Sequence, residues 1–245
     1  MFNKKITNRI PNSVTHLTFG TYFNQSIMNG IPNSVIHLTF GVFFDQPIKD
    51  GIPNSVKYLK FGGGFNQSIF NGIPNSVKYL KFGNFFNQPI RHCIPNSVKH
   101  LKFGTDFNQS IEDSVPNSVT HLKFGIHFRQ DVRGCIPSSV TNLKIGGHLY
   151  QNSIPNTVTH LSFVFQFNQN IENMIPNSLT YLKFEYGFRQ NIDCIPNSIT
   201  RLKVERLYVE KLTKLPSCLT YLQASKEFVE LNKYLISKNV ELDFC

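Results

Sequence analysis

Apolar positions recur along this chain with a period of about 21 residues. The repeated unit reads I-P-N-S-V-x-x-L-x-F-G-x-x-F-N-Q-x-I-x-x-x, in which the apolar positions are constant and the x positions vary. Eleven copies are counted from the proline that opens each one, at Pro11, Pro32, Pro53, Pro74, Pro95, Pro116, Pro137, Pro155, Pro176, Pro196 and Pro216. A period this short holds one strand and its return loops, so the pattern predicts a β-rich solenoid of about eleven stacked coils.

The segment V-x-x-L-x-F of each copy is the predicted strand. Side chains alternate across a strand, so Leu17 and Phe19 point to one side while His16 and Thr18 point to the other. The proline before the segment cannot donate to a sheet, and the glycine after it permits a turn. Stacked coils are therefore expected to form one parallel sheet with a strand spacing of about 4.8 Å.

Two columns of phenylalanine form the predicted core, because a single coil cannot bury these rings whereas neighbouring coils can. The first column holds Phe19, Phe40, Phe61, Phe82, Phe103, Phe124, Phe163 and Phe184, and the second holds Phe23, Phe44, Phe65, Phe86, Phe107, Phe128, Phe167 and Phe188. The asparagines of the I-P-N-S phrase, beginning with Asn12 and Asn33, are expected to hydrogen-bond the backbone of the next coil.

The repeats predict a solenoid domain over residues 1–223 and a C-terminal cap over residues 224–245. Within the cap, a spacing of three or four positions between apolar residues predicts a helix over about 225–236, and a short strand is expected over 239–244. The helix is expected to cover the final coil, because the end coils of a solenoid expose their cores. At the other end, residues 1–9 provide at most half a coil.

The five cysteines form no C-x-x-C pair. Cys93 and Cys135 occupy the same position two coils apart, which corresponds to about 9.6 Å. A disulfide needs Cα atoms within about 7 Å. We therefore expect these cysteines and Cys194, which shares their position, to be half-buried free thiols in a reducing compartment. A cytoplasmic protein is the prediction, since the chain shows neither a signal peptide nor a membrane-spanning segment.

The phrase F-N-Q-S-I-M-N-G-I-P-N-S and its copies resemble the FNIP repeat family, over about residues 2–217. The resemblance implies a leucine-rich-repeat-like horseshoe, and L-P-S-C-L-T-Y-L-Q at 215–223 is similar to a short leucine-rich repeat. The repeat differs from leucine-rich repeats at one position, since Tyr22 and Phe43 stand where leucine-rich repeats carry asparagine. Family members are known from social amoebae and from large amoeba-infecting viruses. Many carry an F-box, which implies substrate recruitment to a ubiquitin ligase, but no F-box is present in this sequence.

Positive charge is concentrated at the outward positions of the predicted strands. The chain has 25 Lys and Arg against 15 Asp and Glu, a net charge of +10. The three outward columns of the eleven repeats contain eleven of the basic residues and none of the acidic ones. The predicted partner-binding residues on this concave face are Lys57, Tyr58, Lys60, Lys78, Tyr79, Lys81, Lys99, His100, Lys102, His121, Lys123, Lys144, Tyr181 and Lys183.

The pattern indicates a non-enzymatic, monomeric scaffold that binds an acidic protein surface on this face. A solvated face copied by duplication is the alternative structural interpretation, and binding of nucleic acid or another polyanion is the alternative function. No catalytic motif is present, and the sequence spreads like groups evenly where catalysis needs unlike groups at one place. Histidines such as His16 and His37 recur by duplication without a carboxylate, so neither a metal site nor a cofactor is expected.

Overall fold

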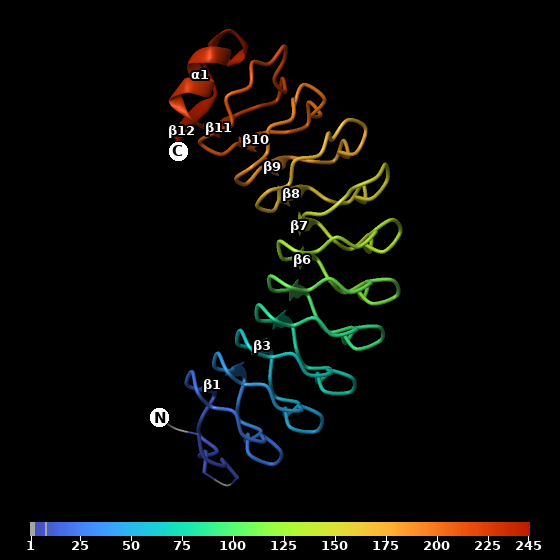
Figure 1. Ribbon diagram of the computed structural model, residues 1–245, viewed down its shortest axis with the longest axis vertical. Coiled ribbons are helices and arrows are strands. Elements are labelled where there is room, and N and C mark those ends of the chain that lie inside the picture. Colours follow the sequence, from blue (N-terminus) through green and yellow to red (C-terminus); the bar gives the residue numbers. More distant parts are fainter. Residues whose placement is uncertain (1–2, 8) are drawn as a thin grey trace. The chain divides into compact units, whose positions relative to one another are not determined.

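A computed structural model describes residues 3–7 and 9–245, and these form two compact units, residues 1–130 and residues 131–245. Figure 1 shows that each unit is a stack of coils, with the strands on one side and the return loops on the other. The first unit contains β1 (His16–Thr18), β2 (His37–Thr39), β3 (Tyr58–Lys60), β4 (Tyr79–Lys81), β5 (His100–Lys102) and β6 (His121–Lys123). The second contains β7 (Asn142–Ile145), β8 (His160–Phe163), β9 (Tyr181–Lys183), β10 (Arg201–Lys203), β11 (Tyr221–Ala224) and β12 (Glu241–Phe244).

Strand order follows chain order in each unit, and each strand pairs in parallel with the next one. The register aligns identical repeat positions, so that Leu59 faces Leu80 and Lys60 faces Lys81. The predicted solenoid with one parallel strand in each coil is therefore confirmed. The strands are shorter than V-x-x-L-x-F, because the valine belongs to a turn in which the Val56 amide donates to the Pro53 carbonyl at 3.2 Å.

The two phenylalanine columns form the core, as predicted. Phe44, Phe65 and Phe86 are fully buried, and their ring centroids are 6.0–6.1 Å apart from coil to coil. Within one coil, the rings of Phe61 and Phe65 stack at 4.0 Å. Each ring therefore contacts its own coil and both neighbours, which is how a thin coil of about 21 residues acquires a core.

Polar ladders join the coils on either side of this core. The side-chain oxygen of Asn66 accepts the backbone N–H of Asn87 at 2.9 Å and the amide of Gln88 at 3.1 Å, and the same pattern recurs in other coils. The serine of the I-P-N-S phrase donates to the previous coil, as Ser76 does to the Val56 carbonyl at 2.7 Å. The bond expected for the I-P-N-S asparagines is seen at Asn197, whose side-chain oxygen accepts the Ser217 N–H of the next coil at 3.2 Å. The ladder that recurs from coil to coil belongs to the asparagine of F-N-Q.

The glycine two residues after each of strands β2–β6 lies in close contact with the preceding coil. A Cβ atom added to Gly83 would lie 1.7 Å from the carbonyl oxygen of Gly62, and one added to Gly62 would lie 1.9 Å from that of Gly41. No side chain fits at these distances. Glycine is therefore required here by steric contact between coils.

The C-terminal segment packs against the last coils. Helix α1 (Lys226–Asn232) is capped by Ser225, whose hydroxyl accepts the N–H of Phe228, and a 3₁₀ turn (Lys233–Leu235) follows it. Phe228 is buried against Tyr208, with ring centroids 5.6 Å apart. The fully buried Asn232 accepts from the Leu212 amide at 2.8 Å and donates to the Glu210 carbonyl at 2.9 Å. The predicted helical cap is confirmed, although the α-helix ends at Asn232.

The N-terminal segment continues the asparagine ladder. Asn3 accepts from the Asn24 amide at 2.9 Å, and Ile6 is buried. The expected half coil over residues 1–9 includes residues 1–2 and 8, which lie outside the described part of the chain.

The cysteines at the shared repeat position differ in exposure. Cys93 and Cys135 are half-buried and form no disulfide, as expected, and burial raises the pKa of the Cys93 thiol. Cys194 is also free but exposed, contrary to the expectation.

Candidate functional site

The candidate site is the outward face of strands β1–β6 in the first unit. In every strand the central leucine points into the core and the two flanking residues lie on this face. Seven lysines belong to the face, four of them within or at the end of strands β3–β6 and three just before strands β3–β5: Lys57, Lys60, Lys78, Lys81, Lys99, Lys102 and Lys123. The structure thus brings the predicted lysines of this unit onto one surface.

A column of aromatic rings runs between the lysine rows. His16 stacks on His37 with centroids 4.2 Å apart, and Tyr58 stacks on Tyr79 at 4.3 Å. Longer, tilted contacts connect these pairs to each other and to the next rings, at 5.5 Å between His37 and Tyr58 and 5.9 Å between Tyr79 and His100. His100 and His121 follow at 4.2 Å. Six rings therefore form one continuous column, in which two pairs stack face to face and the other contacts are tilted by 31–32°.

The lysines and rings of the face interact electrostatically. The Lys102 ammonium lies over the Tyr79 ring, 5.1 Å from its centroid. Burial, together with the positive charge of Lys102, lowers the pKa of the His100 imidazole. Burial and the neighbouring Tyr79 raise the pKa of the Tyr58 hydroxyl. Burial therefore favours the neutral forms of the His100 imidazole and the Tyr58 hydroxyl.

Net charge is unequal between the two units. The first unit has thirteen Lys and Arg and five Asp and Glu, whereas the second has twelve and ten. The first unit therefore has a net charge of +8 and the second +2. Among the residues that the structure describes, no carboxylate forms an ion pair with Lys60, Lys81 or Lys102; the recorded acidic partners in this unit are Asp113 with Arg91 and Asp106 with His127.

The face of the second unit is different, because carboxylates reach it. Glu185 forms an ion pair with Lys144 and lies 3.9 Å from Lys183. Further along, Asp243 of β12 accepts from the Tyr221 hydroxyl at 2.6 Å and from Gln223 at 3.0 Å. The acid-free face inferred from the eleven repeats therefore does not hold here: Glu185 occupies a position that is glycine in earlier copies, and β12 adds acidic residues beyond the last repeat.

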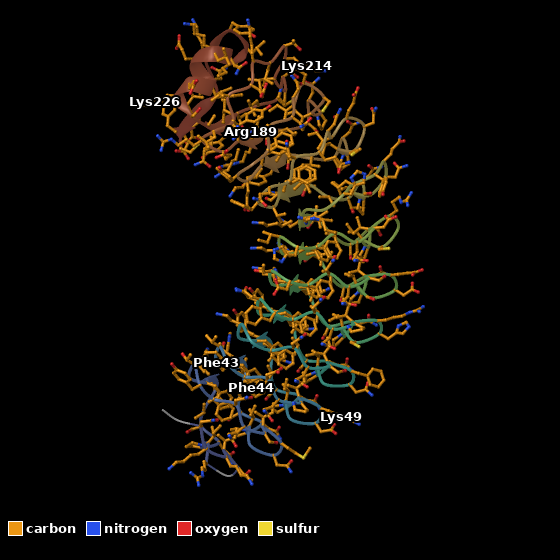
Figure 2. The ribbon with its side chains drawn as sticks, in the orientation of Figure 1. Phe43, Phe44, Lys49, Arg189, Lys214 and Lys226 are labelled. Carbon is orange, nitrogen blue, oxygen red and sulfur yellow. The ribbon has the colours of Figure 1, made fainter. Side chains whose placement is uncertain are left out.

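A row of exposed aromatic side chains, which we call the aromatic rim, was missed by the sequence analysis. Tyr22, Phe43 and Phe85 are 46%, 52% and 60% exposed, and each follows its strand in the turn before the buried phenylalanine. Figure 2 shows Phe43 on the strand side of the first unit, Phe44 within the coils and Lys49 on the opposite edge. The sequence does indicate the rim, because the second x of F-G-x-x-F is aromatic in these three copies.

Within residues 3–7 and 9–245, no three His, Cys, Asp or Glu side chains gather closely enough to ligate a metal ion. In the same part of the chain, no helix has the length and apolar character that crossing a membrane requires.

Parallel in-register strands, one in each coil, with a phenylalanine core and a polar outward face, define a leucine-rich-repeat-like solenoid. The FNIP Repeat family matches residues 2–43, 44–85, 86–127, 107–148, 128–166, 148–187 and 167–206. The chain therefore belongs to the FNIP repeat family. A comparison with curated proteins finds no match.

Solved structures support the same class. CroV588, described as a novel circular LRR protein, is 38% identical with a TM-score of 0.75; the match covers 99% of this chain and 42% of CroV588. This chain thus spans less than half of the CroV588 length. YopM from Yersinia enterocolitica WA-314 is 18% identical (TM-score 0.54, 96% of this chain and 56% of YopM). The leucine-rich repeat-containing protein LegL7 from Legionella pneumophila is 16% identical (TM-score 0.53, 93% and 90%). The last two show the fold alone.

Proposed function

We propose that this protein is a binding scaffold whose first unit captures an acidic protein segment on the outward face of β1–β6. The observation that carries the proposal is the concentration of positive charge: seven lysines lie on one face of a unit with a net charge of +8. A surface of one sign attracts partners of the opposite sign and selects against others. Tyr58 and Tyr79 add contact area of the kind that dominates binding energy at protein interfaces.

Register explains why the lysines favour an extended or elongated partner. Lys60, Lys81 and Lys102 occupy equivalent places on three successive strands, about 4.8 Å apart. Like charges at this spacing repel one another, so a partner that supplies carboxylates along the row removes an unfavourable interaction as well as forming new ones. Lys144 and Lys183 contribute less to partner binding in this proposal, because both already pair with Glu185.

The aromatic column favours protein over single-stranded nucleic acid. Proteins that bind single strands offer free ring faces on which bases stack. Here the ring faces of the column are occupied by neighbouring rings, 4.2 Å apart for His16 and His37 and 4.3 Å for Tyr58 and Tyr79. What remains for a partner is a line of ring edges with hydroxyl and imidazole groups, which suit hydrogen bonding to carboxylates and amides.

A charge-reversal experiment tests the proposal. Fluorescence anisotropy would follow a labelled peptide of alternating Glu and Ser, and separately a labelled oligo-dT, as each binds the wild-type chain. The variant carries Lys60→Glu, Lys81→Glu and Lys102→Glu. Its matched control carries Lys4→Glu, Lys5→Glu and Lys49→Glu, three exposed lysines of the same unit outside the face. Both variants change the net charge equally, so a difference between them reports position.

We expect the face variant to weaken peptide binding about tenfold or more, since three attractions of about 0.2–1 kcal/mol each become repulsions. The control should change affinity far less, and melting temperatures should stay close to wild type. Equal losses in the two variants would reject the face as the site. Tighter binding of oligo-dT than of the peptide, with a steep loss of affinity as salt increases, would favour the nucleic-acid alternative.

Three finer properties stay predictions. Cytoplasmic localisation is checked by fractionation, and a monomeric state by sedimentation. The link to ubiquitin-ligase recruitment, implied by the resemblance, is checked by co-purification of a ligase subunit with the chain.

A further inference from the structure

The aromatic rim contains one vacant position. Residues 22, 43, 64 and 85 occupy equivalent places in successive coils, because the backbone N–H of each later residue donates to the previous coil: Phe43 to Thr21, Gly64 to Val42 and Phe85 to Gly63. Three of these places hold exposed rings, and the fourth is Gly64. The rim therefore lacks a side chain between Phe43 and Phe85.

The vacancy has the width of one side chain. Where adjacent rim positions are both filled, the rings pack directly, as Tyr22 and Phe43 do with centroids 5.4 Å apart. Phe43 and Phe85 are two coils apart, which corresponds to about 9.6 Å. A ring or branched chain placed midway would lie about 4.8 Å from each, within the range in which aromatic side chains attract one another. The floor of this place is backbone, because a Cβ atom added to Gly64 would lie 2.8 Å from the Val42 carbonyl oxygen and 3.6 Å from the Phe43 Cα atom.

Chain geometry connects the vacancy with the lysine face. Lys60 and Gly64 are in the same coil, four residues apart, so their Cα atoms are separated by at most about 14 Å. An extended peptide rises about 3.3–3.6 Å per residue. One bound segment could therefore place an apolar side chain at Gly64 and a carboxylate near Lys60 if the two lie within about four residues of each other.

We propose that Phe43, Gly64 and Phe85 form a slot that receives one aromatic or large aliphatic side chain of the acidic segment. This inference rests on the proposed function and deepens it, because it makes the ligand an acidic segment with an apolar anchor. Exposed apolar groups next to a charged surface are a common mark of protein interaction sites. The positive charge of the same unit supplies the complementarity that selects an acidic neighbour for that anchor.

A pair of probe peptides tests the slot on the full chain. One is labelled Glu-Ser-Glu-Ser-Phe-Ser-Glu-Ser-Glu, and the other has Ala in place of Phe. Anisotropy titrations compare both peptides on the wild type and on Phe43→Ala, Phe85→Ala and Phe70→Ala. Phe70 is the matched control, since it is 60% exposed like Phe85 but lies in the return loop outside the rim. Thermal unfolding of each variant verifies that the fold is retained.

On the wild type we expect the Phe peptide to bind about tenfold more tightly than the Ala peptide. Phe43→Ala and Phe85→Ala should reduce this ratio to about threefold or less, while Phe70→Ala preserves it.

Equal binding of the two peptides to the wild type would overturn the slot and leave the acidic-binding face in place. A ratio that Phe70→Ala lowers as much as Phe43→Ala does would also overturn the slot. Binding of neither peptide would reject the face and the slot together. The comparison of the two peptides on the wild type needs no variant, so it tests the slot even if a variant fails to fold.

Discussion

Replacing Gly83 with alanine tests the close backbone contact between coils that glycine permits in the first unit. The added Cβ would lie 1.7 Å from the Gly62 carbonyl oxygen and 2.4 Å from its carbon. Both are backbone atoms, so no side-chain rotation relieves the overlap. Separating a carbon and an oxygen to about 3.2 Å requires a local shift of about 1.5 Å between the third and fourth coils.

That shift would break the hydrogen bonds on either side of the contact. The Phe61 amide donates to the Lys81 carbonyl at 2.9 Å, and the Phe85 amide donates to the Gly63 carbonyl at 2.9 Å. At about 1 kcal/mol for each bond, plus partial loss of phenylalanine packing between the coils, we expect Gly83→Ala to lower the free energy of unfolding by about 3 kcal/mol. For a chain of 245 residues this corresponds to a fall of about 6–12 °C in Tm.

Gly20 provides the matched control. It occupies the same repeat position in the first coil, yet no described atom lies within 4 Å of its added Cβ. Gly20→Ala should be neutral or stabilising by up to about 1 kcal/mol, because alanine restricts the unfolded chain. Urea denaturation followed by circular dichroism compares the two variants. If Gly83→Ala unfolds at the same urea concentration as Gly20→Ala, the proposed coil contact does not exist.

Three further predictions concern polar groups. Burial and the charge of Lys102 lower the pKa of His100, so the unfolded chain binds a proton at higher pH than the folded chain does, and the free energy of unfolding falls as pH drops below the ordinary value of 6.5. Urea midpoints measured across pH 5 to 7.5 should therefore vary less with pH for His100→Asn than for the wild type. The same dependence of the midpoint on pH in both proteins would contradict this. Tyr208 is buried and donates to the Gln190 carbonyl at 3.0 Å, so Tyr208→Phe should cost about 1–2 kcal/mol in denaturant titrations, and no cost would mean the bond is absent. Asn232→Ala leaves the Leu212 amide and the Glu210 carbonyl unpaired and should cost about 2–4 kcal/mol, with amide exchange at Leu212 accelerated; slow exchange there would refute the bond.

Sequence predicted the features that depend on the repeat itself. The alternation of Leu59 with Tyr58 and Lys60, repeated in each copy, determines which side chains enter the core and aligns them in register. Stacked phenylalanines such as Phe65 and Phe86 follow from the same period. These predictions succeeded because a one-strand coil can bury its apolar side only against its neighbours.

Other features depend on geometry that a repeat pattern does not contain. Both the asparagine of I-P-N-S and that of F-N-Q can bond to an adjacent coil, and the path of the loop makes the second the recurrent ladder. Glu185 reaches Lys144 two strands away, a contact between unlike copies. The rim was missed because Tyr22 and Phe43 sit at a variable position, where aromatic identity appears in some copies and not in others.

A titration that resolves individual lysines tests the central claim most directly. Reductive methylation with ¹³C-labelled formaldehyde gives each lysine its own NMR signal, and single Lys→Arg variants assign them. On addition of the Glu-Ser-Glu-Ser-Phe-Ser-Glu-Ser-Glu peptide, the signals of Lys60, Lys81 and Lys102 should shift together with one dissociation constant, while those of Lys49 and Lys214 stay in place. Uniform shifts at all lysines, or shifts confined to Lys49 and Lys214, would contradict an acidic-binding face on β1–β6.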